Sequence, residues 1–408
     1  MKKNNDKPKL RFPGFNDPWE QRKLGEISDK VTEKNTENFY DETLTNSAEF
    51  GIVTQRDFFD KNISNAKNLN GYYVVQNDDF VYNPRISNFA PVGPIKRNKL
   101  ARTGVMSPLY YVFRTHDIDK TYLEHYFDTT CWHSFMKLNG DSGARSDRFA
   151  IKDSVFIEMP IPFPNLEEQK KIGKFFDTIT NLVTLHQRKL NHLQDKKKSL
   201  LQKMFPKNGE DFPELRFPGF TDPWEQRKLG ELVEQVIREV SKPTTPYDRV
   251  SVRSHAKGTF HQHVDDPSKV AMEKLFVVRN KDLIVSITFA WEHAIAVANE
   301  TDDGLLVSHR FPTYRADGKS DIEFLHYLVS QEKFRQKLEL ISPGGAGRNR
   351  VLNKNDFIKI EVIVPDDIEE QKKIGFFFKQ LDALITLNQR KLNHLQEQKK
   401  ALLQQMFI

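Results

Sequence analysis

The densest group of acidic residues able to do chemistry is PDDIEEQK at residues 365–372. Asp, Glu and Lys in close succession are the residue types that hold Mg²⁺ beside a reacting phosphate. Such metal ligands usually come from neighbouring strands, whereas these stand together at the start of a helical pattern. The equivalent earlier segment, PFPNLEEQK, contains no aspartate. We therefore predict no metal site at this position.

A second candidate for chemistry is NDPW at residues 16–19. It resembles the Asn/Asp-Pro-Pro-Tyr/Trp motif of amino-methyltransferases, which holds the exocyclic amine of a flipped base. The second proline is missing, the later copy TDPW (221–224) also lacks the Asn, and no glycine-rich loop after a strand offers a site for S-adenosylmethionine. We interpret Trp19 and Trp224 as residues that anchor a turn to a domain surface.

Glycine, histidine and cysteine residues give no stronger indication of catalysis. The segment GGAGRNR (344–350) lacks the Lys-Ser/Thr of a P-loop. The histidine pairs His116/His125 and His261/His263 lack the cysteine or carboxylate pattern of a metal site. With Cys131 as the single cysteine, no disulfide framework is possible, which favours a cytoplasmic location. We predict a chain with no catalytic residue.

The residues that would position any site are arranged as an internal duplication. Residues 9–27 and 214–232 are identical at 16 of 19 positions, and residues 166–205 and 368–407 at 27 of 40. The offsets of 205 and 202 residues make one repeat of about 200 residues, with divergent sequence between the matching parts. Short apolar runs between Gly, Asn, Asp and Pro predict mixed α/β domains there, with one helix each near 121–138 and 321–340.

Both repeated 40-residue segments have apolar residues spaced alternately by four and three, the pattern of a coiled coil. Polar residues interrupt it at equivalent places, His186/Asn388 and Lys197/Lys399. The simpler alternative is two ordinary core helices, but these segments are far longer than an average helix. The candidates for helix pairing and subunit docking are Ile172, Phe176, Ile179, Val183, Leu190, Leu193, Leu200, Ile374, Phe378, Leu381, Ile385, Leu392, Leu395 and Leu402.

These patterns predict an α+β fold with two mixed α/β domains joined by two long antiparallel coiled-coil helices, related by pseudo-two-fold symmetry. The predicted segments are a first variable domain (1–165), a central helix (166–205), a linker (206–213), a second variable domain (214–367) and a C-terminal helix (368–408). The antiparallel pair would hold the two domains at a fixed separation.

Charge and polar loops favour binding to DNA. The chain carries a net charge of +6, although segments 166–205 and 368–408 contribute +5 and +3, so the rest is slightly acidic. Glycine-rich loops with arginine allow close approach to phosphate and bidentate contacts to guanine. A solvated loop or strand end is the alternative for each. The candidate DNA contacts are Tyr82, Asn83, Arg85, Arg145, Arg148, Arg253, Ser254, His255, Lys257, Thr288, Trp291, Arg348 and Arg350.

Two divergent domains, each followed by LEEQKKI or IEEQKKI and a long heptad helix, resemble the specificity subunit of type I restriction–modification enzymes. The leader FPGF-DPWEQRKLGE is similar to that of staphylococcal members, and the resemblance covers essentially the whole chain. It implies two target recognition domains that each read half of a bipartite DNA site. It also implies that the helices act as a spacer and dock two methylation subunits.

The same resemblance implies two motor-nuclease (restriction) subunits, with S-adenosylmethionine, ATP and Mg²⁺ bound by the partner subunits and no cofactor on this chain. Nothing in the sequence predicts a membrane partner. Two alternatives stay open: a self-sufficient DNA methyltransferase or nuclease, against which the missing cofactor loop argues, and a coiled-coil scaffold that binds no DNA. The repeated leader is expected to pack near the ends of the shared helices or against a methylation subunit.

Overall fold

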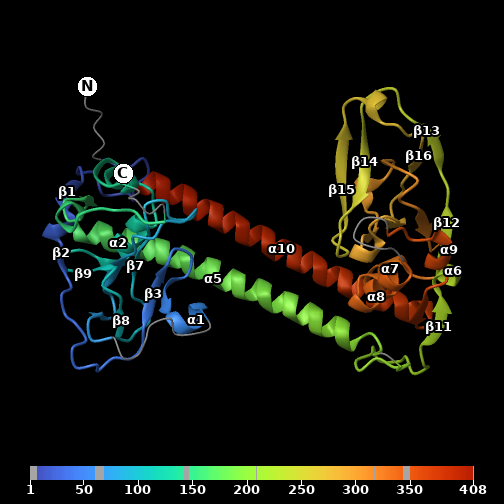
Figure 1. Cartoon of the computed structure of the whole chain (residues 1–408), viewed down its shortest axis with the longest axis horizontal. Helices are drawn as coiled ribbons and strands as arrows, with labels where there is room; N and C mark the ends of the chain where they lie inside the picture. The colour runs from blue at the N-terminus through green and yellow to red at the C-terminus, as the bar shows by residue number, and fades with distance from the viewer. Residues whose placement is uncertain are drawn as a thin grey trace. The chain divides into compact units, whose positions relative to one another are not determined.

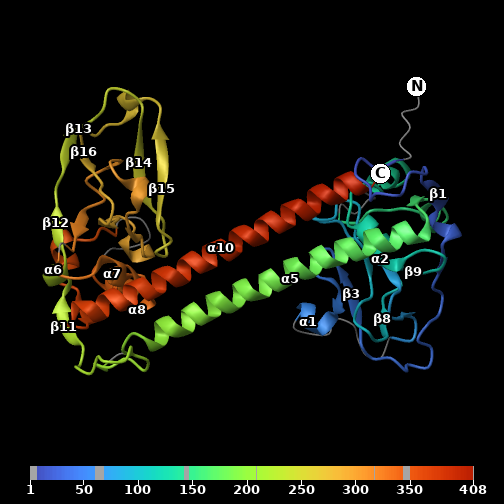
Figure 2. The ribbon, with the colours of Figure 1, turned by 180° about the vertical axis from the view of Figure 1, so that it is seen from behind.

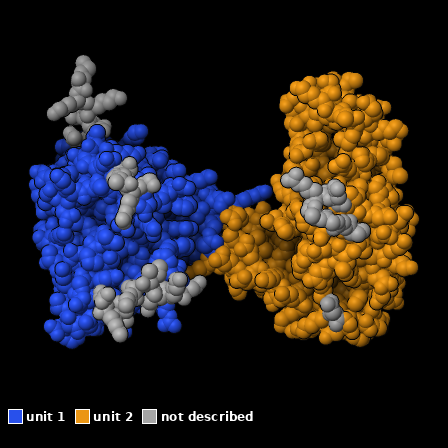
Figure 3. Space-filling view, in the orientation of Figure 1, with its two compact units in different colours: residues 1–187, 390–408 blue, residues 188–389 orange. Residues whose placement is uncertain are grey.

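The computed structural model of the chain describes residues 7–59, 69–141, 147–207, 209–316, 318–342 and 350–407. Contacts divide the chain into unit 1, residues 1–187 and 390–408, and unit 2, residues 188–389 (Figure 3). Each unit therefore combines one variable region with parts of both long helices. Among the described residues, no helix combines the length and the apolar character needed to cross a membrane.

Unit 1 is built on a four-stranded antiparallel sheet in the order β2-β9-β6-β7, and it also contains the smaller sheets β1-β10, β3-β4 and β5-β8. The elements are β1 (Glu20–Lys23), η1 (Leu24–Glu26), β2 (Ser28–Lys30), β3 (Leu44–Ser47), β4 (Gly51–Thr54), α1 (Gln55–Phe59), β5 (Tyr73–Val75), β6 (Phe80–Tyr82), β7 (Ile95–Arg97), β8 (Gly104–Met106), β9 (Tyr111–Thr115), α2 (Lys120–Phe127), α3 (His133–Asn139), α4 (Asp153–Phe156) and β10 (Pro160–Phe163).

Unit 2 contains a four-stranded sheet, β12-β20-β17-β18, and a five-stranded sheet, β13-β16-β19-β14-β15. The elements are β11 (Glu225–Lys228), α6 (Leu229–Leu232), β12 (Glu234–Val236), β13 (Glu239–Ser241), β14 (Tyr247–Val252), β15 (Thr259–Val264), η3 (Pro267–Lys269), β16 (Lys274–Val277), β17 (Leu283–Val285), η4 (Ala290–Glu292), β18 (Ile295–Val297), η5 (Glu300–Asp302), β19 (Leu306–Val307), β20 (Thr313–Arg315), α7 (Ile322–Val329), α8 (Glu332–Leu340), α9 (Lys354–Phe357) and β21 (Glu361–Val364).

The long helices are α5 (Leu166–Lys203) and α10 (Ile368–Met406), which begin where the sequence predicts and end two residues earlier. Asn165 caps α5 by accepting from the Glu168 backbone N–H at 2.9 Å, and Asp367 caps α10 by accepting from that of Glu369 at 2.8 Å. Each helix contributes residues to both units.

The two helices meet inside each unit in opposite directions (Figures 1 and 2). In unit 1 the start of α5 packs against the end of α10, where the rings of Phe176 and Phe407 have centroids 5.9 Å apart. In unit 2 the end of α5 meets the start of α10, with the rings of Phe205 and Phe378 separated by 6.3 Å. The predicted α+β class, with its duplicated mixed domains and long helices, is confirmed, whereas the division into five segments stays a prediction.

The prediction of one helix near 121–138 and one near 321–340 is wrong, because each region holds two short helices, α2 with α3 and α7 with α8. After α2, the Thr129 hydroxyl donates to the Tyr126 carbonyl at 2.6 Å. After α7, the Ser330 hydroxyl donates to the His326 carbonyl, also at 2.6 Å. These side chains compete for the carbonyls that would continue the helix, which the apolar pattern alone does not show.

Candidate nucleic-acid interface

In unit 2, three segments that are distant in the sequence meet at one surface. The loop between β14 and β15 is fixed to η4, because the backbone N–H groups of His255 and Ala256 donate to the carbonyls of Glu292 and His293, both at 2.8 Å. The segment after β17 is tied to the chain beyond Arg350 by a 2.7 Å bond from the Leu352 N–H to the Ile287 carbonyl. We call residues 253–258, 286–293 and 350 the unit 2 contact surface.

The polar side chains of this surface are partly held by one another. The Ser254 hydroxyl donates to Glu292 at 2.6 Å. The guanidinium of Arg350 lies over the Trp291 ring, 5.4 Å from its centroid, and 3.6 Å from a carboxylate oxygen of Glu339. This pairing orients an aromatic face and a positive charge together, an arrangement suited to phosphate and base contacts.

The remaining candidates of unit 2 lie beside these residues. Arg253 is exposed, donates to the Thr259 carbonyl and has its guanidinium 5.1 Å from the centroid of the Phe260 ring. His255 and Lys257 are exposed. Thr288 is half-buried, with its hydroxyl 3.3 Å from that of Ser286. The structure thus brings together all the described unit 2 candidates.

In unit 1, the segment after β6 lies against the chain that leads to α4. Arg85 and Arg148 form an isolated antiparallel bridge, and the Ile86 N–H donates to the Asp147 carbonyl at 3.0 Å. The Asn83 side chain donates to the Asn46 carbonyl at 2.8 Å. Arg85 is 68% exposed. We call residues 83–90, 147 and 148 the unit 1 contact surface.

The two contact surfaces share one framework and differ in side chains. Each joins the segment after an equivalent strand, β6 or β17, to the chain just before α4 or α9. Arg148 and Arg350 occupy equivalent places in the repeat. The third segment differs, since unit 1 adds β3 through Asn46 and unit 2 adds the β14–β15 loop.

Three of the candidate DNA contacts are not placed on the two contact surfaces. Arg145 and Arg348 lie outside the described residues and stay predictions. Tyr82 is a core residue, only 3% exposed, with its hydroxyl donating to the Val92 carbonyl at 2.9 Å and its ring stacked on Phe156 at 5.0 Å. The structure therefore assigns Tyr82 to packing and not to a DNA contact, because β6 is buried along its whole length.

Sequence reasoning missed three residues in or next to the unit 1 contact surface: Asn46, Gln55 and Phe89. Phe89 is 79% exposed on a tight turn, and all three line one groove. The turn residues Ser-Asn before Phe89 could have indicated an exposed loop tip. Nothing in the local sequence marks Asn46 or Gln55.

In each unit, the repeated leader is anchored to the start of a long helix. Arg11 grips the fully buried Glu168 with two hydrogen bonds of 2.7 and 2.8 Å, and the Trp19 indole N–H donates to the same carboxylate at 3.2 Å. The hydrogen bond to Glu168 raises the pKa of Arg11. Unit 2 repeats the anchor with Arg216, Trp224 and Glu370. The prediction that both tryptophans are packing residues is confirmed, since they are 4% and 2% exposed.

The next residue of the repeated helix start holds the domain as well. The Gln169 side chain accepts from the Asp119 N–H at 2.9 Å and donates to the Pro164 carbonyl at 2.7 Å. Gln371 makes the equivalent bonds in unit 2. Gly375 allows α7 to approach, because a Cβ there would lie 2.6 Å from the Phe324 nitrogen. The EEQKKIG segment is thus a joint between helix and domain.

The acidic cluster at 365–372 is accounted for by protein partners. Asp366 pairs with Arg227, Asp367 caps α10, and Glu369 accepts from Lys372 at 2.7 Å, while Glu370 belongs to the leader anchor. In the part of the chain that the structure describes, no group of three or more His, Cys, Asp or Glu residues is placed to hold a metal ion.

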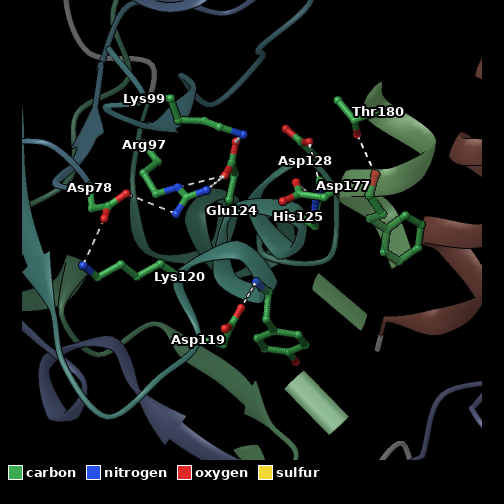
Figure 4. A network of polar contacts seen from close by, with 12 residues as sticks. Asp78, Arg97, Lys99, Asp119, Lys120, Glu124, His125, Asp128, Asp177 and Thr180 are labelled. Carbon is green, nitrogen blue, oxygen red and sulfur yellow. Dashed lines mark hydrogen bonds and ion pairs between the residues drawn. The ribbon is translucent and has the colours of Figure 1, made fainter. Parts of the chain in front are cut away.

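A charged network fixes α2 to the sheet of unit 1 (Figure 4). Arg97 of β7 is 10% exposed, donates to Glu124 at 2.8 Å and lies 3.2 Å from Asp78. Lys120 closes the network with a 3.3 Å contact to Asp78. Every member has an opposite charge beside it, so the network positions α2 and offers no free acid or base.

The other end of α2 is held by the long helices. His125 Nε2 lies 3.0 Å from an Asp177 oxygen of α5, and Lys399 of α10 lies 3.6 Å from Asp128 (Figure 4 shows the first contact). Burial alone would raise the pKa of Asp128, but the His125 imidazole 3.6 Å away and the charges of Lys96 and Lys399 outweigh it, so its pKa is lowered. Asp128 therefore stays ionised as a partner for the helix lysine.

The fourteen helix candidates are all buried or half-buried, whereas most residues between them are exposed. Ile172 and Phe176 belong to the core of unit 1, and Ile374 and Phe378 to that of unit 2. Their assignment to subunit docking stays a prediction. Lys197, at a polar break of the heptads, pairs with Asp382 at 2.6 Å, as Lys399 pairs with Asp128.

Comparison with known proteins gives one family. The model of the type I restriction modification DNA specificity domain matches residues 16–195 and again 221–397. Two relatives come from Methanocaldococcus jannaschii: a putative type I restriction enzyme MjaX specificity subunit, 24% identical over 262 residues, and the type I restriction enzyme MjaVIII specificity subunit, 22% identical over 267 residues. Each alignment covers 62% of this chain, and the matched part spans 60% and 62% of the two relatives.

Two solved structures are similar in fold. The S subunit of a type I restriction-modification system from M. genitalium is 13% identical, with a TM-score of 0.54, covering 98% of this chain and 99% of that one. A chain from a study of complex assembly and conformational transition of the type I R-M system is 17% identical, with a TM-score of 0.50, covering 97% and 98%. At these identities the likeness concerns the fold.

Proposed function

The chain belongs to the family of the type I restriction modification DNA specificity domain, of which it carries two copies, and from this premise we propose that it is the sequence-recognition subunit of a type I restriction–modification complex. Each unit reads one half of a bipartite DNA site. Because the two units differ in their contact residues, the site is asymmetric.

One observation carries this proposal: two contact surfaces stand on the same framework but present different side chains. Unit 1 presents Asn83, Arg85 and Arg148, whereas unit 2 presents Ser254, Trp291 and Arg350. A duplicated scaffold with a varied surface is what reading two different sequences requires, since base contacts specify while phosphate contacts only position. A scaffold that binds no DNA would need no such variation.

The long helices set the spacing between the two half-sites. In support, α5 and α10 are continuous over 38 and 39 residues, and each joins residues of unit 1 to residues of unit 2. The fixed joints at Glu168 and Glu370 would transmit that spacing to the domains.

The chemistry belongs to partner subunits. Two methylation subunits would dock on the helices and bind S-adenosylmethionine, and two restriction subunits would use ATP and Mg²⁺. This chain holds no cofactor and acts in the cytoplasm, where its DNA lies. In support, the acids of the nuclease-like segment are engaged by arginine, lysine and backbone groups.

The direct test is methylation-sensitive genome sequencing of the host with and without this chain. A single asymmetric bipartite motif should be methylated only when the chain is present. The enzyme alternative predicts instead that the purified chain alone transfers methyl groups to DNA. The scaffold alternative predicts an unchanged methylation pattern, and either result would refute the proposal.

A further inference from the structure

A groove of about 470 Å³ is lined in part by the unit 1 contact surface, and the family match assigns this groove no role. Residues of β3, α1 and the segment 83–94 line it, including Asn46, Gln55, Phe58, Arg85 and Phe89. The groove therefore combines amide groups, aromatic rings and one arginine. All of them belong to unit 1.

Aromatic side chains gather at this groove and stay exposed. Phe89 is 79% exposed and Phe58 40%, and Phe58 contacts Phe50, itself 64% exposed, at a ring distance of 6.2 Å. The turn that carries Phe89 is rigid, because Ser87 and Ala90 exchange backbone hydrogen bonds of 3.1 Å in both directions. Grouped exposed apolar residues mark binding sites, whereas isolated ones do not.

Two amide oxygens of the groove lining are buried and have no hydrogen-bond partner, Oδ1 of Asn46 and Oε1 of Gln55. The orientation of the Asn46 amide is fixed, since its NH₂ group donates to the carbonyls of Val81 and Pro94 at 2.7 and 3.2 Å. Buried acceptors are almost always satisfied in folded proteins. A donor supplied by a ligand would complete both.

The occupant must offer both a flat face and N–H donors. Aromatic side chains stack on the faces of bases, and a face is open only where a base has left the helical stack. An exocyclic amino group offers two N–H donors, one for each acceptor, whereas a thymine turned out of the helix offers only its ring N3–H. Arg85, 68% exposed and part of the lining, can hold the phosphate of such a nucleotide.

Resting on the proposed function, we propose that this groove receives one base of the first half-site, turned out of the DNA helix. The base carries an exocyclic amino group, so it is adenine, cytosine or guanine. Phe89 stacks at the mouth of the groove, and Asn46 and Gln55 accept from the base. Thymine at that position is rejected because it leaves an acceptor unsatisfied.

The test measures competition binding of the full chain, purified with its accompanying subunits, to duplexes of its methylated motif. A mismatch that frees the extruded base removes part of the cost of unpairing it, so one position of the unit 1 half-site should gain affinity by roughly tenfold. Phe89→Ala should lower affinity by roughly fivefold to a hundredfold. Phe39→Ala is the matched control, because Phe39 is 83% exposed and does not line the groove.

Gln55→Met removes an acceptor at nearly constant length and should relax the rejection of thymine at the same position, whereas Gln21→Met on exposed β1 should not. The groove assignment is overturned if no mismatch in that half-site raises affinity, or if Phe89→Ala and Gln55→Met bind like the parent. A parent that shows no bipartite preference would instead overturn the proposed function.

Discussion

At the scale of single residues, Glu168 and Glu370 explain why the leader sequence is repeated. Each is fully buried, paired with one arginine and bonded to one tryptophan of the leader. The leader stays similar in both copies because its Arg and Trp must meet the same carboxylate. The repeated leader sequence therefore forms a joint between domain and helix and not a catalytic site.

This joint predicts a large effect from a small change. Glu168→Gln keeps the shape but removes the charge that Arg11 pairs with, and it should lower the free energy of unfolding by about 3 kcal/mol. Chemical denaturation of the full chain measures this. Glu167→Gln, at the adjacent exposed position, should change it by less than about 0.5 kcal/mol. Equal stability of the two variants would contradict the role of the anchor.

The buried His293 makes the free energy of unfolding depend on pH. Its imidazole is 4% exposed and hydrogen-bonds the Val329 carbonyl at 2.7 Å; burial lowers its pKa, and the bond opposes this only in part. The unfolded chain therefore binds a proton, at a pKa of about 6.5, before the folded one does. The free energy of unfolding should fall as the pH drops below about 6.5.

His293→Asn, which tolerates the positive φ of 63° at this position, should remove that part of the pH dependence. The measurement is denaturant unfolding between about pH 5 and 8. His192→Asn, on an exposed face of α5, serves as the control and should keep the slope of the parent. A parental slope in the His293 variant would show that the buried imidazole does not titrate as described.

Residue types and spacing predicted the individual DNA-contact residues less well than they predicted the duplicated domains and the long helices. Five predicted contacts do lie on the two surfaces: Arg85, Arg148, Ser254, Trp291 and Arg350. They could be predicted because arginines and glycine-rich turns are easy to recognise in a sequence. Tyr82 was misjudged, since a tyrosine at a strand end reads the same whether its ring faces the core or solvent. Long-range packing decides that question.

At the scale of elements, the heptads predicted both long helices to within two residues of their ends. A period repeated over many turns is a strong signal, whereas α2 and α3 were merged because a short polar break carries little weight. The lysines that interrupt the heptads form ion pairs with carboxylates. Lys197 of α5 pairs with Asp382 of α10 and so ties one helix to the other. Lys399 of α10 pairs with Asp128 and so ties the helix to the domain of unit 1.

Removing one such lysine should weaken the joint modestly. Among the described residues, Lys197→Met leaves Asp382 the Tyr327 hydroxyl, 2.8 Å away, as its hydrogen-bond partner. It should lower the free energy of unfolding by about 1 kcal/mol, since the pair is partly exposed. Urea unfolding compares it with Lys196→Met, a neighbouring exposed lysine expected to be neutral. A stabilised Lys197 variant would mean that the charge only disturbs an apolar seam.

At the scale of the whole molecule, the proposed spacer role makes helix length a variable of DNA recognition. Four residues inserted after position 187 and after position 389 add about 6 Å to each helix and should lengthen the preferred spacer by about two base pairs or prevent assembly. Seven residues inserted at the same two positions keep the heptad phase and should lengthen the preferred DNA spacer by about three base pairs. Full methylation with an unchanged spacer would refute the spacer role.

The central claim, that each unit reads its own half of the site, is tested most directly by exchanging residues 28–140 with those of a homologue and sequencing the methylated motif. The exchanged segment holds the groove and most of the unit 1 contact surface but leaves both leader anchors in place. We predict that one half of the motif changes to that of the donor while the other half and the spacer stay the same. An unchanged motif, or one altered in both halves, would contradict the account.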